Sequence, residues 1–221
     1  MQHPYFCKRS NKVVNNMMQQ RAIFVDRDGV INQNRADHVK TWSEFSFEWG
    51  ALDGLVKLAG LHLPIIVITN QGAIGRGLTT CESVDEIHRR MIIAVQQAGG
   101  RIDGVLVCPH HPDDNCSCRK PKPGMLIDAA SRWNIDLKRS FLIGDAATDL
   151  EAGWAVGCQT ALVKTGRGAE QLARLQRVGK TGFQITEDLT DAAHWVSDQL
   201  AYERLEDSLK QAVPEFAIET A

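Results

Sequence analysis

The chain has 221 residues, of which 43% are hydrophobic and 24% are charged. This composition is ordinary for a folded globular protein and excludes wholesale disorder, and the length suits one α/β domain with additions. The formal net charge of −2 provides no overall positive field, so we expect neither a nucleic acid nor an anionic membrane as a partner. The longest apolar runs are strand-sized, well below the roughly 20 residues that a membrane helix needs.

Both ends of the chain are predicted to be tails. Residues 1–20 show no apolar periodicity and lack the apolar centre of a secretory signal, which favours a cytoplasmic protein. Residues 201–221 are rich in acidic side chains, and we interpret them as a solvated helix that frays, with a partner-binding tail as the alternative. The domain itself is predicted to span residues 21–200.

Between the tails, short β-branched runs alternate with helix-like stretches. We predict buried strands at residues 22–26, 65–69, 104–108, 141–145 and 160–164. We predict helices at residues 51–60, 80–98, 124–133, 149–156, 168–178 and 188–209. This alternation predicts an α/β fold, a doubly wound, Rossmann-like parallel sheet with helices on both faces.

Four of these predicted strands end at a residue that can bind a ligand. Asp26, Thr69, Cys108 and Asp145 each come last in an apolar run. Ligands of open α/β sheets bind outside the carboxyl ends of the strands, so we expect these residues to share one crevice. Asp28 follows Asp26 by two positions, which directs both carboxylates to one side of an extended chain. A divalent cation such as Mg²⁺ would relieve their repulsion, although a surface turn is the alternative for this pair taken alone.

A cysteine-rich segment begins at the end of the third predicted strand. Cys108, His110, Cys116 and Cys118 offer three sulfur ligands and one nitrogen ligand, the donor set of a closed structural Zn²⁺ site. The alternatives are free thiols on a loop, or His111 as the nitrogen ligand in place of His110. Because four protein ligands leave no open position on the metal, we expect the zinc to be structural.

Two cationic residues directly follow the last of these cysteines. Arg119 and Lys120 would be held in place by the zinc and aimed at an anionic ligand. Arg119 is a candidate for substrate recognition because its guanidinium fork can grip a phosphate or several sugar oxygens. The alternative for Arg119 is an ordinary side chain on the loop surface.

Four segments, in this order, resemble the haloacid-dehalogenase-like phosphatase superfamily. They are the Asp26-x-Asp28 pair, the strand that ends at Thr69, Lys120 ahead of a helix, and a strand end that reads Gly-Asp at Asp145. The resemblance covers about residues 21–165. It implies an Mg²⁺-dependent phosphatase without a large cap domain.

The resemblance also implies roles for the carboxylates. Asp26 would attack phosphorus and form an aspartyl-phosphate. Asp28 would act first as an acid and then as a base, provided that its environment lets it be protonated near neutral pH. Mg²⁺ would be held by Asp26, the backbone carbonyl of Asp28 and Asp145. Asp149 would either orient metal-bound water or cap the helix that follows it.

The resemblance also implies which residues bind the phosphoryl group, and a polar loop offers candidates for binding the rest of the substrate. Thr69 and Lys120 would hold the phosphoryl oxygens, helped by the amide of Asn70. The polar loop after the nucleophile strand carries Arg35 and His38, which could read sugar hydroxyls.

The zinc segment narrows the resemblance further. Residues 26–32, 69–77 and 108–125 resemble the D-glycero-D-manno-heptose 1,7-bisphosphate phosphatases of bacterial heptose and lipopolysaccharide precursor synthesis. Histidinol-phosphate phosphatases share the zinc segment, but residues 71–77 follow the heptose pattern. The expected activity is removal of the 7-phosphate from this sugar phosphate by a monomeric enzyme. The alternatives are hydrolysis of histidinol phosphate and a catalytically idle, zinc-stabilised binding module.

Overall fold

The computed structural model describes residues 19–212, with side chains described through residue 210. Most of the predicted N-terminal tail (1–18) and the end of the predicted C-terminal tail (213–221) lie outside the described residues. Residues 201–212 continue the last helix without a break. Among the described residues, no helix is both long enough and apolar enough to cross a bilayer.

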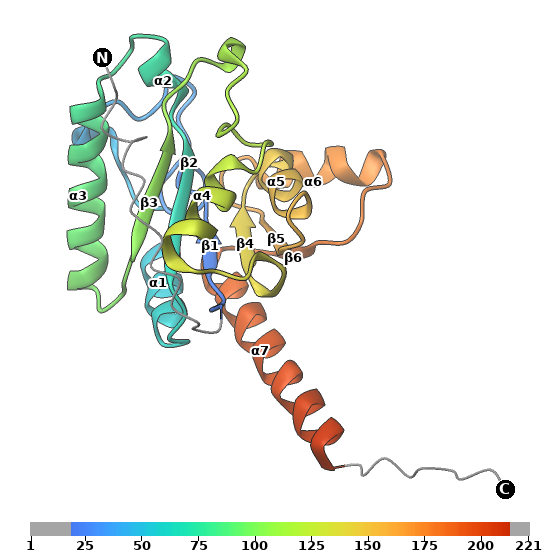
Figure 1. Ribbon diagram of the computed structural model, residues 1–221. Helices are drawn as coiled ribbons and strands as arrows, with labels where there is room; N and C mark the ends of the chain where they lie inside the picture. The colour runs from blue at the N-terminus through green and yellow to red at the C-terminus, as the bar shows by residue number, and fades with distance from the viewer. Residues whose placement is uncertain (1–18, 213–221) are drawn as a thin grey trace, which may run out of the picture.

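A six-stranded parallel sheet runs through the molecule in the order β3-β2-β1-β4-β5-β6 (Figure 1). Its strands are β1 (Ile23–Val25), β2 (Ile65–Asn70), β3 (Gly104–Cys108), β4 (Phe141–Gly144), β5 (Gln159–Val163) and β6 (Gln184–Thr186). The prediction of a doubly wound parallel sheet is confirmed, but the prediction of five strands misses β6. That strand has only three residues, and Gln184 and Ile185 are exposed at the edge of the sheet, so no buried apolar run marks it in the sequence.

Helices cover both faces of the sheet. They are α1 (Ala51–Ala59), α2 (Gly72–Gly75), α3 (Cys81–Gln97), α4 (Gly124–Trp133), α5 (Ala147–Trp154), α6 (Gly168–Arg177) and α7 (Leu189–Ala212). Three short 3-10 turns join them at Trp42–Glu44, Pro112–Asp114 and Leu137–Arg139. The described residues contain no cap domain over the sheet.

Side-chain alternation along the strands divides the core into two layers. Ile23 and Val25 of β1 point into a cluster shared with α1, α3 and α7, whereas Phe24 points into the cluster beneath α4 and α5. Burying each such side chain contributes about 1.5–3 kcal/mol, so the sheet sits between two apolar layers that hold its register.

The place where a ligand is expected follows from this topology. β1 pairs with β2 on one side and with β4 on the other, so the strand order reverses between β1 and β4. Open α/β sheets bind their ligands at such a reversal, in the crevice outside the carboxyl ends of the strands. Asp26 and Asp145 stand there, one at the end of each strand.

Candidate active site

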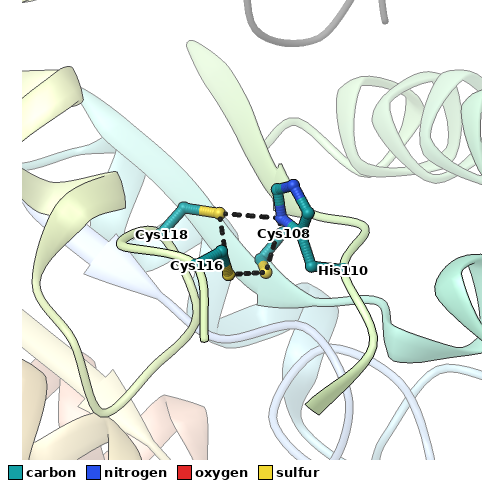
Figure 2. Close-up of side chains that lie close together, drawn as sticks. All are labelled: Cys108, His110, Cys116 and Cys118. Atoms are coloured by element: carbon teal, nitrogen blue, oxygen red, sulfur yellow. Dashed lines mark hydrogen bonds between the residues drawn. The ribbon is translucent and has the colours of Figure 1, made fainter. Parts of the chain in front are cut away.

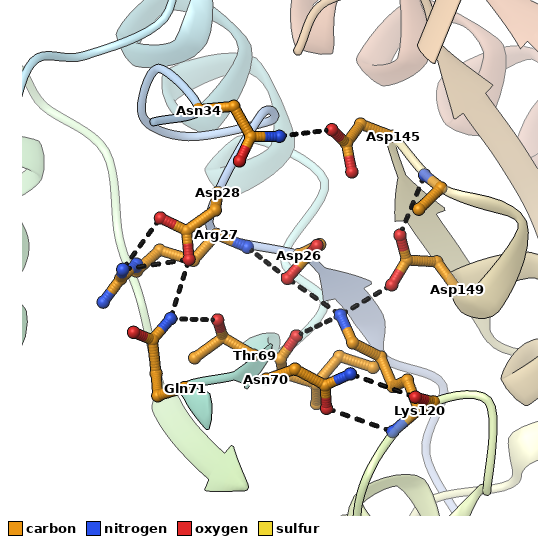
Figure 3. A network of polar contacts seen from close by, with 12 residues as sticks. Asp26, Arg27, Asp28, Asn34, Thr69, Asn70, Gln71, Lys120, Asp145 and Asp149 are labelled. Carbon is orange, nitrogen blue, oxygen red and sulfur yellow. Dashed lines mark hydrogen bonds and ion pairs between the residues drawn. The ribbon is translucent and has the colours of Figure 1, made fainter. Parts of the chain in front are cut away.

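Three carboxylates meet at the crevice between β1 and β4. Asp26 and Asp145 follow those strands, and Asp149 comes from the first turn of α5. An oxygen of each lies within 4.8 Å of an oxygen of the others, and all three side chains are buried (Figure 3). The structure therefore brings together the predicted pair Asp26 and Asp145, and it adds Asp149 to them.

Lys120 inserts its ammonium group among these carboxylates. Its Nζ lies 2.8 Å from Oδ1 of Asp26 and 2.6 Å from Oδ1 of Asp149, and it donates to the carbonyl of Ile68 at 2.9 Å. Asn70 holds the backbone of Lys120, because its side chain accepts from the Lys120 N–H and donates to the Lys120 carbonyl, both at 3.0 Å. The side-chain amide of Asn70 thus positions Lys120.

Asp149 is both a helix cap and a partner of the lysine. Its Oδ2 accepts a hydrogen bond from the backbone N–H of Ala146 at 3.1 Å, at the start of α5, while its Oδ1 faces Lys120. The capping half of the prediction for this residue is thus seen directly in the structure.

The electrostatics of this cluster favour an added cation. Burial raises the pKa of Asp26 to about 7 against the opposing charge of Lys120, and burial together with the charge of Asp26 raises that of Asp145 to about 6. Burial by itself would lower the pKa of Lys120, but the charges of Asp149 and Asp26 raise it. Three buried carboxyl groups therefore share one buried ammonium.

The donor set fits a magnesium ion. The Oδ1 atom of Asp145 is buried and has no hydrogen-bond partner among the described residues, although buried carboxylate oxygens normally have one. Mg²⁺ prefers carboxylate and other oxygen ligands, and it would supply the missing partner. Asp26 and Asp145 are thus suitable metal ligands.

Asp28 points away from this cluster and is held by three side chains. Arg27 donates from one Nη to both carboxylate oxygens, at 2.8 and 2.9 Å, while Asn32 donates at 3.0 Å and Gln71 at 2.7 Å. Burial would raise the pKa of Asp28, but the charge of Arg27 and these hydrogen bonds bring it below its ordinary value. The surroundings therefore favour the ionised form of Asp28 in the structure.

Thr69 and Asp28 accept hydrogen bonds from the same side chain. Gln71 donates from the same Nε2 to Oδ2 of Asp28 and to the hydroxyl of Thr69 at 2.8 Å. Thr69 is buried at the end of β2. The predicted phosphate-binding hydroxyl, the acid–base candidate and the carboxylate cluster thus occupy one edge of the sheet (Figure 3).

The three predicted substrate-recognition residues differ in their surroundings. Arg119 has a buried Nη1 without a hydrogen-bond partner among the described residues, and it passes close over Gly72. Arg35, by contrast, is exposed and pairs with Asp37 at 3.1 Å. His38 adopts a left-handed backbone conformation (φ 65°), and its carbonyl accepts from Lys40. Arg119 alone of the three offers a buried, unused donor.

Sequence reasoning missed two residues that hold Asp145. Asn34 donates to Oδ2 of Asp145 at 2.9 Å, and the backbone N–H of Arg167 donates to the same atom at 2.8 Å. Gly29 has φ 89° and passes so close to Asp145 that a Cβ would collide with the carboxylate. Arg167 could have been found by applying the strand-end rule to β5, but nothing in the sequence sets Asn34 apart from its neighbours.

The zinc-type donor set also forms a compact group (Figure 2). Cys108 Sγ lies 3.6 Å from both Cys116 Sγ and His110 Nδ1, Cys118 Sγ lies 3.5 Å from Cys116 Sγ, and Cys118 Sγ lies 3.2 Å from His110 Nδ1. A tetrahedral Zn²⁺ site with sulfur ligands near 2.3 Å has sulfur–sulfur edges of about 3.8 Å, so the four donors fit this metal. The sulfur separations are too long for a disulfide.

The neighbouring histidine has a different contact. His111 caps the short turn Pro112–Asp114 by accepting from the backbone N–H of Asp113 at 3.3 Å. The structure therefore groups His110, and not His111, with the three sulfurs.

Backbone contacts clamp the cysteine-rich loop from two sides. A Cβ at Gly75 would collide with the backbone N of His111, and a Cβ at Gly124 would collide with the carbonyl of Ser117. Glycine is required at both points because the loop backbone approaches so closely. The loop that precedes Lys120 is thus fixed between α2 and α4.

Known proteins resemble this chain across most of its length. A family model described as HAD-hydrolase-like matches residues 117–192. The D-glycero-β-D-manno-heptose-1,7-bisphosphate 7-phosphatase of Neisseria meningitidis serogroup A is 40% identical over 181 residues, which are 82% of this chain and 97% of the relative. The protein of the same name from Bordetella bronchiseptica is 39% identical over 173 residues, covering 78% of this chain and 96% of the relative.

Solved structures give the same picture. The D,D-heptose 1,7-bisphosphate phosphatase of B. bronchiseptica, crystallised with magnesium and phosphate, superimposes with a TM-score of 0.76 at 37% identity. That match covers 81% of this chain and 99% of the other. The corresponding protein of Burkholderia thailandensis gives a TM-score of 0.61 at 31% identity, covering 79% of this chain and 96% of the other.

Proposed function

The chain belongs to the D-glycero-β-D-manno-heptose-1,7-bisphosphate 7-phosphatase family, within the HAD-like hydrolases, and from this premise we propose that it removes the 7-phosphate of that sugar. The observation that supports this most is the 40% identity over 82% of the chain to a relative so named. The family also supports the β anomer as the preferred substrate over the α anomer.

Asp26 is the proposed nucleophile. Its Oδ1 accepts from the backbone N–H of Arg27 at 2.7 Å and faces Lys120, so two donors fix the orientation of the carboxylate. In the first step the other oxygen forms a bond to phosphorus while the bond from phosphorus to the sugar oxygen breaks, which leaves an aspartyl-phosphate. In the second step a water oxygen attacks that phosphorus, and inorganic phosphate leaves as the carboxylate is restored.

Asp28 is the proposed acid and base for these two steps. It would give a proton to the departing sugar oxygen and then take one from the attacking water. The network of Arg27, Asn32 and Gln71 favours the ionised form that the second step needs. The negative charge of an approaching substrate would raise the pKa of Asp28 and favour the protonated form that the first step needs.

The metal and the cationic side chains would offset the charge of the phosphate. Asp26, the backbone carbonyl of Asp28 and Asp145 would hold Mg²⁺, which when bound neutralises the negative charge between nucleophile and phosphate. Thr69 and Lys120 would bind the phosphoryl oxygens, where charge accumulates. Lys120 is already tied to Asp26 and Asp149, so it needs little rearrangement.

Specificity would come from the loop before Lys120. Arg119 has the buried, unpartnered donor that a second phosphate or a set of sugar oxygens could use. Zn²⁺ bound by Cys108, His110, Cys116 and Cys118 would hold this loop in shape. Roles for Arg35 and His38 in reading sugar hydroxyls remain predictions, and Arg35 would first have to leave Asp37.

The setting of the enzyme is also a proposal. We infer a monomer that works in the cytoplasm on the precursor of lipopolysaccharide heptose. The described cysteines form no disulfides, which fits a reducing compartment.

Phosphate release tests the function directly. The purified protein with Mg²⁺ is given the β and α anomers of the heptose 1,7-bisphosphate and histidinol phosphate, with Asp26→Asn as the blank. The highest kcat/KM is expected for the β anomer. A higher kcat/KM for histidinol phosphate would favour the alternative enzyme, and no release from any phosphomonoester would favour the binding module.

A further inference from the structure

A fully buried arginine connects the two catalytic aspartates to helix α3. The side chain of Arg27 has no exposed surface, although guanidinium groups are seldom buried without partners. Its backbone N–H donates to Asp26, and its Nη2 donates to both oxygens of Asp28. Arg27 therefore touches the nucleophile with its backbone and the acid–base residue with its side chain.

The other end of the guanidinium meets a histidine. Nη1 of Arg27 lies 3.1 Å from Nε2 of His88, which is 5% exposed and comes from the buried face of α3. Arginine has no acceptor, so the histidine nitrogen must accept this hydrogen bond and the ring must be neutral. Burial, followed by the charge of Arg27, lowers the pKa of His88 and agrees with a neutral ring.

Among the described residues, the guanidinium group of Arg27 has side-chain hydrogen bonds only with Asp28 and His88. Its Nε is buried and has no hydrogen-bond partner among the described residues. The orientation of the guanidinium plane is thus set by Asp28 on one side and by His88 on the other. If the histidine contact were lost, the guanidinium group could rotate, and Nη2 would no longer point at both oxygens of Asp28.

We propose that His88 is a positioning residue for the phosphatase reaction: by accepting from Arg27, it fixes the guanidinium fork that orients Asp28 for proton transfer. His88 is not among the proposed metal ligands, and it reaches Asp28 only through Arg27. The inference rests on the proposed function, because it needs Asp28 to serve as acid and base.

Two variants of similar polarity separate this role from simple packing. The Oε1 of His88→Gln reaches the place of Nε2 and can accept from Arg27, whereas the shorter His88→Asn reaches only the place of Nδ1. We expect His88→Gln to keep kcat/KM within about threefold and His88→Asn to lose about tenfold or more, which is part of the roughly 100- to 10,000-fold that general acid–base catalysis contributes. KM should change little in either, because the histidine reaches Asp28 only through Arg27.

Comparing substrates with different leaving groups gives a second test, because a packing defect would lower kcat/KM for both substrates alike. An alkyl phosphate needs a proton on its leaving oxygen, whereas the nitrophenolate of p-nitrophenyl phosphate leaves without one. The His88→Asn loss in kcat/KM should therefore be large for the heptose bisphosphate and less than about threefold for p-nitrophenyl phosphate. The matched control is His194→Met, a change at an exposed position on α7, which should leave both rates unaltered.

Equal losses for the two substrates, or equal rates for the Gln and Asn variants, would overturn the inference while leaving the phosphatase function intact. If the wild-type protein hydrolysed neither ester, the proposed function itself would fail. His88→Met, which offers no acceptor, repeats the comparison with Gln if the Asn variant does not fold.

Discussion

The ammonium group of Lys120 lies 2.6 Å from the carboxylate of Asp149, and both side chains are almost completely buried. The same ammonium also faces Asp26, so one lysine links the nucleophile at the end of β1 with the start of α5. Taking a charge out of water is unfavourable, and here each charged group depends on the others for compensation. This mutual dependence makes Lys120 important for stability, in addition to its proposed role in catalysis.

Replacing Lys120 by methionine should therefore damage both properties. We expect Lys120→Met to lower the free energy of unfolding by about 3–5 kcal/mol, because Asp26 and Asp149 lose their common partner. We also expect kcat to fall by about 100- to 1,000-fold, since a charge on the phosphoryl oxygens is lost. Urea unfolding and phosphate release measure the two effects.

The control for this change is Lys210→Met. Lys210 is 73% exposed and lies 3.9 Å from Glu206 on α7, so the unfolding free energy should change by less than about 0.5 kcal/mol. A similar loss of stability in both variants would contradict the argument from burial.

Loss of zinc should lower activity by loosening the cysteine-rich loop that precedes Lys120. We expect the wild-type protein to carry about one zinc ion per chain and Cys116→Ser to carry less. The substitution should also lower kcat/KM by about 10- to 100-fold, because a misplaced Lys120 no longer meets the phosphate correctly. Metal analysis and steady-state kinetics provide the two readings.

Cys158→Ala is the control because Cys158 is a buried thiol that stands outside the group of four metal-binding donors. It should keep its zinc and its activity. Normal kinetics in zinc-free Cys116→Ser would show that the loop holds its shape without the metal.

Arg119→Ala should mainly affect substrate binding. The buried Nη1 of Arg119 is available to a second phosphate, so KM for the heptose bisphosphate should rise by about 10- to 100-fold with a smaller change in kcat. KM for a sugar carrying a single phosphate should change much less. Arg89→Ala, at a 67% exposed position on α3, should alter neither value.

Acid should weaken the fold through His88. Its folded-state pKa is lowered from 6.5 to about 3, so the unfolded chain takes up a proton at a pH where the folded protein does not. The contribution of His88 to the free energy of unfolding is present above the pKa of the unfolded chain, 6.5, and is lost as the pH falls below that value. Between about pH 7.5 and about pH 5.5 the loss amounts to about 1.4 kcal/mol.

Urea unfolding of the wild-type protein and of His88→Gln at both pH values isolates the contribution of His88 to the pH dependence of stability. The Gln variant has no group that titrates at this position, so its unfolding free energy should fall less on acidification. An identical pH dependence in the two proteins would mean that His88 is already protonated in the fold or that its pKa is unchanged.

The sequence predicted those parts of the site that depend on strand ends. Parallel strands bring their carboxyl ends to one edge, so an apolar run followed by Asp26 or Asp145 was enough to place both residues in one crevice. The spacing of the cysteines and His110 likewise predicted a group that is compact in the structure. These features are local in sequence or follow from a simple topology.

Other contacts could not be predicted because they join segments whose relative positions depend on packing. His88, the partner of Arg27, comes from α3. The sequence does not distinguish a buried histidine on a helix from a solvent-exposed one. Asn34 reaches Asp145 from a loop whose path has no periodic pattern. The lowered pKa of Asp28 depends on such contacts as well, so the sequence could not show whether its environment permits protonation near neutral pH.

The sheet carries the carboxylates and the cysteine-rich loop carries Arg119, which bears on how substrate preference can change among related enzymes. The carboxylates of Asp26 and Asp145 are attached to strands whose register two apolar layers enforce, whereas Arg119 stands on a loop tied down by its own cysteines. Insertions or deletions within that loop can reshape the opening toward new esters without shifting a single strand. Such changes can alter the substrate and keep hydrolysis as long as Asn70 still holds Lys120 beside Asp26.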